Sequence, residues 1–503
     1  MSTERPLLSL VATKARNAFA QQRLLSAVLV GSWLVAIAAT AALSDGMTDP
    51  FWQAREGVDV LAGGGWLHPD RWALHAPAQF VPTSPGWQIL LGLGWRAGGV
   101  QGLYLVAVLT IGLALLALVR VARRLGAAVV VMPLMFAWLA VCSPASLTFR
   151  ASFGAIVLVV LLWCEVDAFL ARSQSQWRIV WVAACAFCAS VVGIWMHASW
   201  AGYGVLAAGG CGWLWARVSS ASMRGRIAGS ILVTVIGAAG VTLGPVGLDV
   251  WHEAARVAAV CRDLITEWMP PWQSGNPVLW VSLWLVVLGT TLIALRFGWA
   301  SRRDATPLEL LLLALGLSLL GAALLSVRFL PQAATVLAPV IAAQLTRSLR
   351  STSARARRAA MGERATGLYW SRVFTGVGVA LCVTLAALQL PPFPRLQNPA
   401  IRALPPSCHL LSDAASANLV LLGRQDVRPW IDGRADMWGR ERLVAAQEYL
   451  YGVHPGALLP TGINCVLLRA DDYATLAHWL AGQADWTEIA RTDEFIAWQQ
   501  HRA

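Results

Sequence analysis

Long apolar segments recur along this chain, and they constrain its fold more than any other feature. Several runs hold close to 20 residues with few or no charges, which is the length that a helix needs to cross about 30 Å of hydrocarbon. The runs are continuous rather than alternating, and only helices or closed barrels satisfy every backbone polar group in lipid. The sequence therefore predicts a helical protein that crosses a membrane several times.

Composition agrees with this prediction. The 503 residues are 57% hydrophobic and only 13% charged, with a mean hydropathy of +0.58. Residues 1–23 are polar and basic, and no small-residue cleavage site follows the first apolar run, so we expect an uncleaved signal anchor. We expect eleven spans, at residues 24–43, 102–119, 127–142, 152–170, 179–197, 200–216, 227–247, 277–295, 307–326, 329–346 and 372–390.

Positive charge indicates the orientation of these spans. With the N-terminus inside, the predicted cytoplasmic segments hold 22 Lys and Arg residues and the outside connections hold 7. Cytoplasmic loops carry such an excess, so the net charge of +12 does not indicate nucleic-acid binding. We expect a cytoplasmic segment at 1–23 and a transmembrane domain at 24–390 with its first outer loop at 44–101. Residues 84–98, apolar but short and glycine-rich, predict an interfacial or re-entrant helix within that loop.

Residues 391–503 have a different character and are expected outside the cell. A proline-rich linker at 390–399 precedes short apolar runs at 408–412, 428–432 and 464–468, with helical stretches between them. This alternation predicts a small α/β domain. Cys408 and Cys465 each fall on a predicted strand, and the sequence is compatible with either a disulfide or two reduced, buried thiols. The fold class is thus an all-α polytopic membrane domain with a small C-terminal extracytoplasmic α/β domain.

Ionisable residues recur near the predicted outer ends of the spans. Such groups are costly at membrane depth and are functional candidates by default. Arg328 lies in a two-residue turn between two long spans, so we expect it to point into a cavity or at a lipid phosphate. No glycine-rich phosphate loop, H-E-x-x-H or G-x-S-x-G motif is present, so any chemistry needs an activated substrate made elsewhere. The candidates are Asp45, Asp49, Asp70, Arg150, His197, Arg262, Asp263, Glu267 and Arg328.

Several motifs resemble a known group of bacterial membrane proteins. "DPFWQAREG" (49–57) is similar to the D-x-x-W-x-x-x-x-G stretch that follows the first span in the C-type glycosyltransferase superfamily (the GT-C fold). "HPDRW" (68–72) resembles the second aspartate motif of that group. The chain departs from the pattern at Gln53 and Gly86, where the group often has His and Glu. Further similar stretches lie at 193–204, 265–271, 327–342 and 430–443.

The resemblance implies transfer of a sugar from a polyprenyl-phosphate donor to an envelope glycan or lipid on the outer face. A hydroxyl acceptor must lose its proton to a carboxylate, and the departing phosphate needs a cation. We expect Asp49 to be the general base. No cofactor is identified, and a divalent metal is compatible with the sequence but not indicated by it. The expected substrate-binding residues are Arg328, Arg262 as a second choice for the phosphate, His197, Glu267, Asp70 and Trp52.

Each assignment has an alternative. A helix that begins here could be capped by Thr48 or by Asp49, with Pro50 at the first helical position, so Asp49 would also serve as an N-cap. Arg328 would also reach lipid headgroups from a helix end. For "IDGRAD" (431–436) we favour an ion-paired turn that docks the outer domain, with glycan binding second. For the whole protein, the alternative is a non-catalytic membrane protein of the same fold, such as a carrier, scaffold or assembly factor.

Overall fold

The structure is a computed structural model of the chain. It describes residue 31 and residues 49–64, 70–75, 81–143, 151–175, 177–262, 264–298, 305–359, 398–452 and 459–501. The predicted spans at 24–43 and 372–390 therefore lie outside the described residues, apart from residue 31, and so do Asp45, Arg150 and Asp263.

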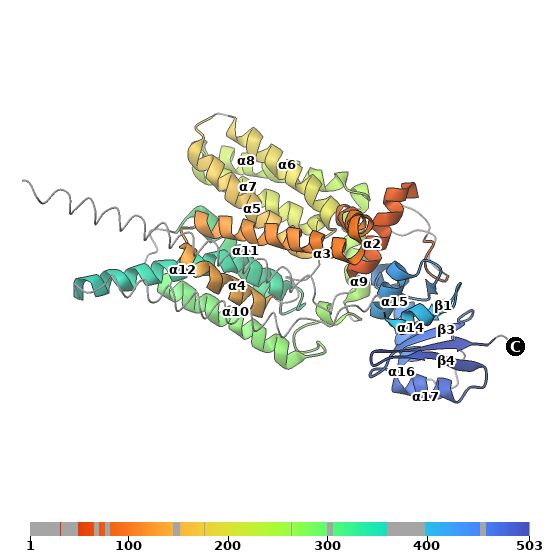
Figure 1. The fold of residues 1–503 in the computed structure, drawn as a ribbon. Helices are drawn as coiled ribbons and strands as arrows, with labels where there is room; N and C mark the ends of the chain where they lie inside the picture. The colour runs from red at the N-terminus through yellow and green to blue at the C-terminus, as the bar shows by residue number, and fades with distance from the viewer. Residues whose placement is uncertain are drawn as a thin grey trace, which may run out of the picture.

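A bundle of apolar helices forms most of the molecule (Figure 1). All nine predicted spans that fall within the described residues coincide with helices, which confirms the helical membrane domain. Six of the described helical segments are long and apolar enough to cross a membrane, while the total of eleven spans stays a prediction. The bundle helices are α3 (Pro85–Arg124), α4 (Met132–Cys142), α5 (Ala151–Arg172), α6 (Arg178–Met196), α7 (Trp200–Val218), α8 (Met223–Ala239), α10 (Pro277–Gly298), α11 (Pro307–Ala322) and α12 (Phe329–Ala359).

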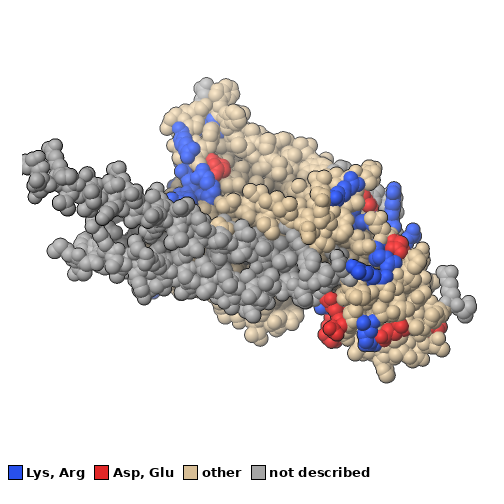
Figure 2. Space-filling model, viewed as in Figure 1, with Lys and Arg blue, Asp and Glu red and all other residues tan. Residues whose placement is uncertain are grey.

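Exposed leucines on α3 identify a surface that needs an apolar solvent. Leu105, Leu109, Leu113 and Leu116 are each at least half exposed, and their spacing places them on one helix face. A stripe of this kind would be unfavourable in water but is matched to lipid. Figure 2 shows charged side chains gathered at the two ends of the described surface, with a broad uncharged band between them. The membrane-spanning character is thus visible in both the helices and their surface.

The predicted short helix at 84–98 is the first arm of α3. The backbone leaves helical geometry at Gly98 and Gly99, and Gly99 has a φ of 56°, which glycine adopts without steric cost. The bend brings the backbones of Gly94 and Gly102 together, since a Cβ built on either would overlap the other residue. The helix break is where the sequence indicated it, and the depth of this arm in the membrane stays a prediction.

A five-stranded sheet lies beyond one end of the bundle (Figure 1). Its order is β2-β1-β3-β5-β4, with β1 parallel to β2 and β3, and β5 antiparallel to β3 and β4. The elements are α14 (Pro399–Ala403), β1 (His409–Leu411), α15 (Ala414–Gly423), β2 (Arg428–Pro429), α16 (Ala435–Tyr451), β3 (Cys465–Arg469), α17 (Ala474–Ala481), β4 (Trp486–Arg491) and β5 (Phe495–Gln500).

Three predicted strands are confirmed, and two were not foreseen. The runs at 408–412, 428–432 and 464–468 correspond to β1, β2 and β3, whereas β4 and β5 form an additional antiparallel pair. Along β3, Val466 and Leu468 join one hydrophobic cluster while Cys465 and Leu467 join another. Alternate side chains of a strand point to opposite faces, so both faces of the sheet are covered.

Cys408 and Cys465 are disulfide-bonded, with their Cα atoms 5.9 Å apart. This bond joins the start of β1 to the start of β3, which pair directly through Leu410 and Cys465. Of the two states that the sequence allowed, the structure thus has the disulfide.

Candidate functional site

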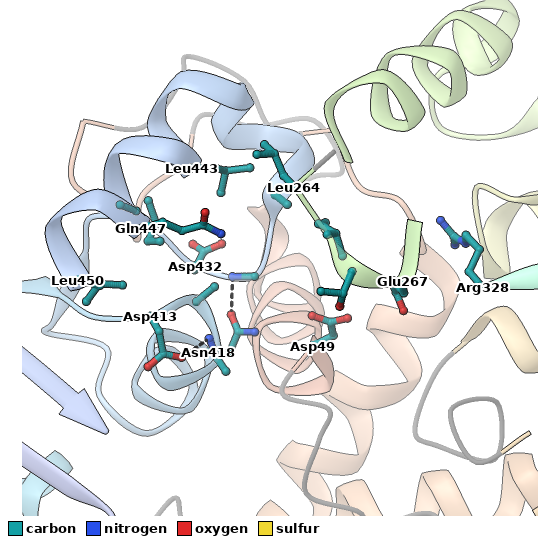
Figure 3. A pocket seen from close by; sticks show the side chains of 18 of the residues that line it. Asp49, Leu264, Glu267, Arg328, Asp413, Asn418, Asp432, Leu443, Gln447 and Leu450 are labelled. Atoms are coloured by element: carbon teal, nitrogen blue, oxygen red, sulfur yellow. Dashed lines mark hydrogen bonds between the residues drawn. The ribbon is translucent and has the colours of Figure 1, made fainter. Parts of the chain in front are cut away.

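A cavity lies between the helical bundle and the C-terminal domain (Figure 3). Its volume is about 620 Å³, which is within the range of small-molecule sites. One wall comes from the membrane domain and the other from the C-terminal domain. The polar residues that line it are Asp49, Ser152, Thr266, Glu267, Arg328, Gln332, Asp413, Asn418, Asp432, Gln447, Tyr451 and Tyr473.

Asp49 enters this cavity because it begins α2 (Asp49–Asp59). Helix α2 packs on both α3 and α15. Its Gly57 touches the α3 backbone so closely that a Cβ there would overlap the carbonyl group of Gln88. On another side Trp52 is 4% exposed and packs in one cluster with Trp72 and Leu421. The tryptophan and glycine of the D-x-x-W-x-x-x-x-G stretch therefore hold the helix that carries the aspartate.

Glu267 and Arg328 meet in the same wall through paired backbone segments. The backbone N–H of Arg328 donates to the carbonyl oxygen of Glu267 at 2.9 Å, and that of Val327 donates to Met269 at 2.9 Å. The Arg328 guanidinium carbon lies 3.8 Å from the ring centroid of Trp268, a cation–π contact. Figure 3 shows Asp49, Glu267 and Arg328 on one side of the cavity. Two carboxylates and one guanidinium thus come from three separate segments.

The opposite wall is built on the C-terminal domain. Asp413 caps α15, accepting the backbone N–H groups of Ala415 and Ser416 at 3.0 Å. Asn418 of the same helix accepts the N–H of Gly433 at 2.8 Å, and a Cβ at Gly433 would overlap the Asn418 side chain. Figure 3 shows Asp413, Asn418, Asp432 and Gln447 on this side. These contacts fix the loop after β2 against α15.

A buried ion-pair cluster joins the loop that contains Asp70 to the C-terminal domain. Arg434 donates to Asp432 at 2.5 Å and to Asp70 at 2.9 Å, and all three side chains are 0% exposed. The guanidinium carbon of Arg434 also lies 4.5 Å from the Trp72 ring centroid. Burial alone would lower the pKa of Arg434, but its ion pairs with Asp432 and Asp70 outweigh burial, and the pKa is raised. These contacts agree with the predicted ion-paired docking turn.

Of the seven residues expected at the site, Asp49, Glu267 and Arg328 line the cavity. Asp70 and Trp52 are held in the contacts just described, outside the lining. His197 caps α6, donating its backbone N–H to Gly193 at 2.9 Å, and its ring Nδ1 lies 2.8 Å from the Ser199 hydroxyl. Arg262 is an exposed residue at the end of α9 (Val250–Cys261) and does not line the cavity. Asp49, Glu267 and Arg328 are therefore the expected site residues that the structure brings together in the cavity.

The polar residues of the C-terminal wall that sequence reasoning missed are Asp413, Asn418, Gln447, Tyr451 and Tyr473. A signal for two of them was present, because Asp413 follows the predicted strand at 408–412 and Tyr473 follows the one at 464–468. Ligands of open α/β sheets bind beyond the carboxyl ends of parallel strands. Asn418, Gln447 and Tyr451 gave no such signal.

Among the described residues, no group of three or more His, Cys, Asp or Glu side chains is arranged to hold a metal ion. Four carboxylates line the cavity: Asp49 and Glu267 on the membrane-domain side, and Asp413 and Asp432 on the C-terminal side. The absence of a cofactor stays an expectation.

Searches for similar proteins found fold relatives only. No family model matches the sequence, and no curated protein does. Among solved structures, the arabinofuranosyltransferase AftD from Mycobacteria is 14% identical with a TM-score of 0.51. The match covers 96% of this chain and 40% of AftD, so this chain spans less than half of that protein. ArnT from Cupriavidus metallidurans, solved bound to undecaprenyl phosphate, is 14% identical with a TM-score of 0.55, covering 95% of this chain and 98% of ArnT.

Proposed function

Since this chain has the GT-C fold of those two membrane glycosyltransferases, we propose that it transfers a sugar from a polyprenyl-phosphate donor to an envelope acceptor on the outer face. The observation that carries the proposal is the meeting of Asp49 and Arg328 in one cavity at the end of the bundle. The bound undecaprenyl phosphate of ArnT supports a donor of this class.

In the proposed reaction, an acceptor hydroxyl attacks the anomeric carbon of the donor sugar. Asp49 takes the hydroxyl proton as the new C–O bond forms. The bond from the anomeric carbon to the phosphate oxygen breaks, and the polyprenyl phosphate leaves with the electron pair. Arg328 stabilises the charge that develops on that phosphate, because guanidinium stays ionised and can bind two oxygens at once. Both groups that these roles need line the same cavity.

The proposal is tested with the full chain in lipid nanodiscs. We expect it to bind undecaprenyl phosphate, and to transfer label from at least one undecaprenyl-phospho-sugar to an envelope extract. Binding without transfer from any donor would support the non-catalytic alternative, and the absence of binding would contradict the proposal.

Arg328→Ala is expected to weaken undecaprenyl phosphate binding by roughly 10- to 150-fold, because a hydrogen bond to a charged group contributes about 1.5–3 kcal/mol. Arg328→Lys should lie between Ala and wild type, since it keeps the charge and loses the bidentate geometry. Arg262→Ala is the matched control, because this exposed arginine lies outside the cavity lining. Dissociation constants measured in nanodiscs check this, and equal affinity in all four proteins would remove the assignment.

We also propose that the N-terminus is cytoplasmic and that the C-terminal domain lies outside, from the asymmetry of Lys and Arg. Asp471 is exposed on the C-terminal domain, so Asp471→Cys should react with a membrane-impermeant maleimide in intact cells. Ser353→Cys, in the basic segment after the predicted span at 329–346, should react only after permeabilisation. Both are made in a background without the exposed Cys185 and Cys188. The reverse labelling pattern would contradict the orientation.

A further inference from the structure

The carboxyl ends of the three parallel strands face the cavity. Asp413 follows β1, Asp432 follows β2 and Tyr473 follows β3, and all three residues line it. These strands are neighbours in the sheet order β2-β1-β3. Loops beyond the carboxyl ends of adjacent parallel strands are the usual ligand-binding edge of an open α/β sheet. The C-terminal domain thus presents a binding edge to the cavity.

Two tyrosines form an aromatic surface at this edge. The rings of Tyr451 and Tyr473 lie 5.4 Å apart between centroids, tilted by 59°. Tyr451 ends α16 and is 59% exposed, whereas Tyr473 is 9% exposed beside it. An exposed aromatic ring supported by a buried one is suited to pack against the C–H face of a sugar ring. The hydroxyl groups of tyrosines can also form hydrogen bonds.

Hydrogen-bonding groups adjoin these rings. Gln447 lies one turn before Tyr451 on α16, is exposed, and lines the cavity. Its amide supplies both donors and an acceptor. Burial is the main cause that raises the pKa of the Tyr473 hydroxyl, and Asp413 and Tyr451 add to it, so this hydroxyl stays protonated at neutral pH and is able to donate. The edge therefore offers neutral donors and acceptors of the kind that bind sugar hydroxyls.

Charge restricts what this edge binds. The cavity lining contains the carboxylates of Asp49, Glu267, Asp413 and Asp432, while Arg328 is the single basic residue among the described residues that line it. Arg328 belongs to the membrane-domain wall, and Arg434 lies outside the lining, where Asp432 and Asp70 bind it. Asp432 is fully buried and paired with Arg434, so a phosphorylated or carboxylated acceptor would meet the like charge of Asp413 on the C-terminal wall.

We propose that the C-terminal wall binds the acceptor, and that the part of the acceptor bound there is an uncharged, hydroxyl-rich saccharide. Tyr451 provides the stacking surface, and Tyr473 and Gln447 bind hydroxyls. This inference rests on the proposed function, since it assigns the donor to the opposite wall. The sequence allowed either an envelope glycan or a lipid as the acceptor, and this inference restricts the acceptor to a glycan.

Saturation-transfer NMR on the full chain in nanodiscs tests the inference. The probes are methyl glycosides of glucose, mannose, galactose and arabinofuranose, the methyl glucuronide as the charged counterpart of the glucoside, and undecaprenyl phosphate. We expect at least one neutral glycoside to bind wild type, and to lose at least threefold of its signal with Tyr451→Ala and with Gln447→Ala. Tyr451→Phe keeps the ring and should retain the signal. Glu448→Ala, next to Gln447 but outside the lining, is the matched control.

The donor probe separates this inference from the proposed function. Tyr451→Ala should bind undecaprenyl phosphate as wild type does, and Arg328→Ala should bind the glycoside normally. If wild type binds undecaprenyl phosphate but no neutral glycoside, the acceptor subsite is wrong and the proposed function stands. If a glycoside binds but undecaprenyl phosphate does not, the proposed donor is wrong and the saccharide subsite stands. Equal binding of glucoside and glucuronide, or a glycoside signal that Tyr451→Ala leaves unchanged, would overturn the inference.

Discussion

Asp49→Asn is expected to lower the rate of sugar transfer by about 10²–10⁴-fold, the usual effect of losing a general base. The substitution keeps the size of the side chain and an oxygen that accepts hydrogen bonds, but the amide cannot take a proton. Asp49 is placed for this role because it begins α2 and lines the same cavity as Arg328. We therefore expect normal insertion and unchanged binding of undecaprenyl phosphate.

The alternative role of Asp49, as a helix cap, predicts a different magnitude. Loss of a cap costs about 1 kcal/mol of stability, and Asn is as good a cap as Asp. A capping role thus predicts wild-type transfer by Asp49→Asn and a lower melting temperature for Asp49→Ala. Asp45→Asn, at an acid four residues earlier that we expect to be solvated, is the control and should be active. Initial rates with a labelled donor, beside thermal melting, distinguish the two roles.

Arg434→Ala is expected to lower the free energy of unfolding by about 3–5 kcal/mol, which is the effect of removing one partner from a buried ion pair. Asp432 and Asp70 would both remain buried without their cation. The substitution also removes the guanidinium from the face of Trp72. Because Asp70 belongs to the first outer loop, we expect this loop to detach from the C-terminal domain, and activity to fall with stability.

Arg491→Ala is the control for Arg434→Ala. Arg491 pairs with Glu488 at 2.5 Å on the surface, where its side chain is 56% exposed, and exposed pairs contribute little. Thermal melting and limited trypsin digestion of the full chain measure both variants. Combining Arg434→Ala with Asp70→Asn should cost less than the two single effects together, because the residues share one ion-pair network. An Arg434→Ala protein that is fully stable but inactive would instead favour glycan binding by this turn.

The helices of the membrane domain and three strands of the sheet follow from local sequence. The runs that became β1 and β3 contain short apolar stretches, as strands covered on both faces do, whereas β2 is a two-residue edge strand, Arg428–Pro429, followed by apolar Trp430 and Ile431. Strand β4 lacked that pattern, whereas β5 begins with a buried apolar run at 495–498 that we did not predict as a strand. On β4, Glu488 is half-buried and Arg491 is exposed, and polar Gln499 and Gln500 end β5. Their pairing depends on each other and on β3, which no single segment reveals.

The site divides in the same way. Asp49 and Arg328 were predictable because an ionisable residue beside a long apolar run is conspicuous in sequence, and Glu267 because it lies in the stretch 265–271 that resembles a GT-C motif. The sequence favoured Asp49 over Asp70 as the base only through its motif and its closeness to the first predicted span, since both acids are expected in the same loop. The structure separates them, since Asp70 is fully buried against Arg434 while Asp49 lines the cavity. Burial and pairing with a residue 364 positions away are tertiary properties.

The sequence by itself therefore determined that this is a multi-pass helical membrane protein with an α/β domain at its C-terminus. The spans can be predicted from local sequence because each helix must by itself be long and apolar enough to cross the hydrocarbon core. The tertiary structure alone decided which acid reaches the cavity, and that Tyr451, Tyr473 and Gln447 oppose it. A binding site joins residues distant in sequence, and their meeting depends on packing contacts such as that of Gly57 on α3.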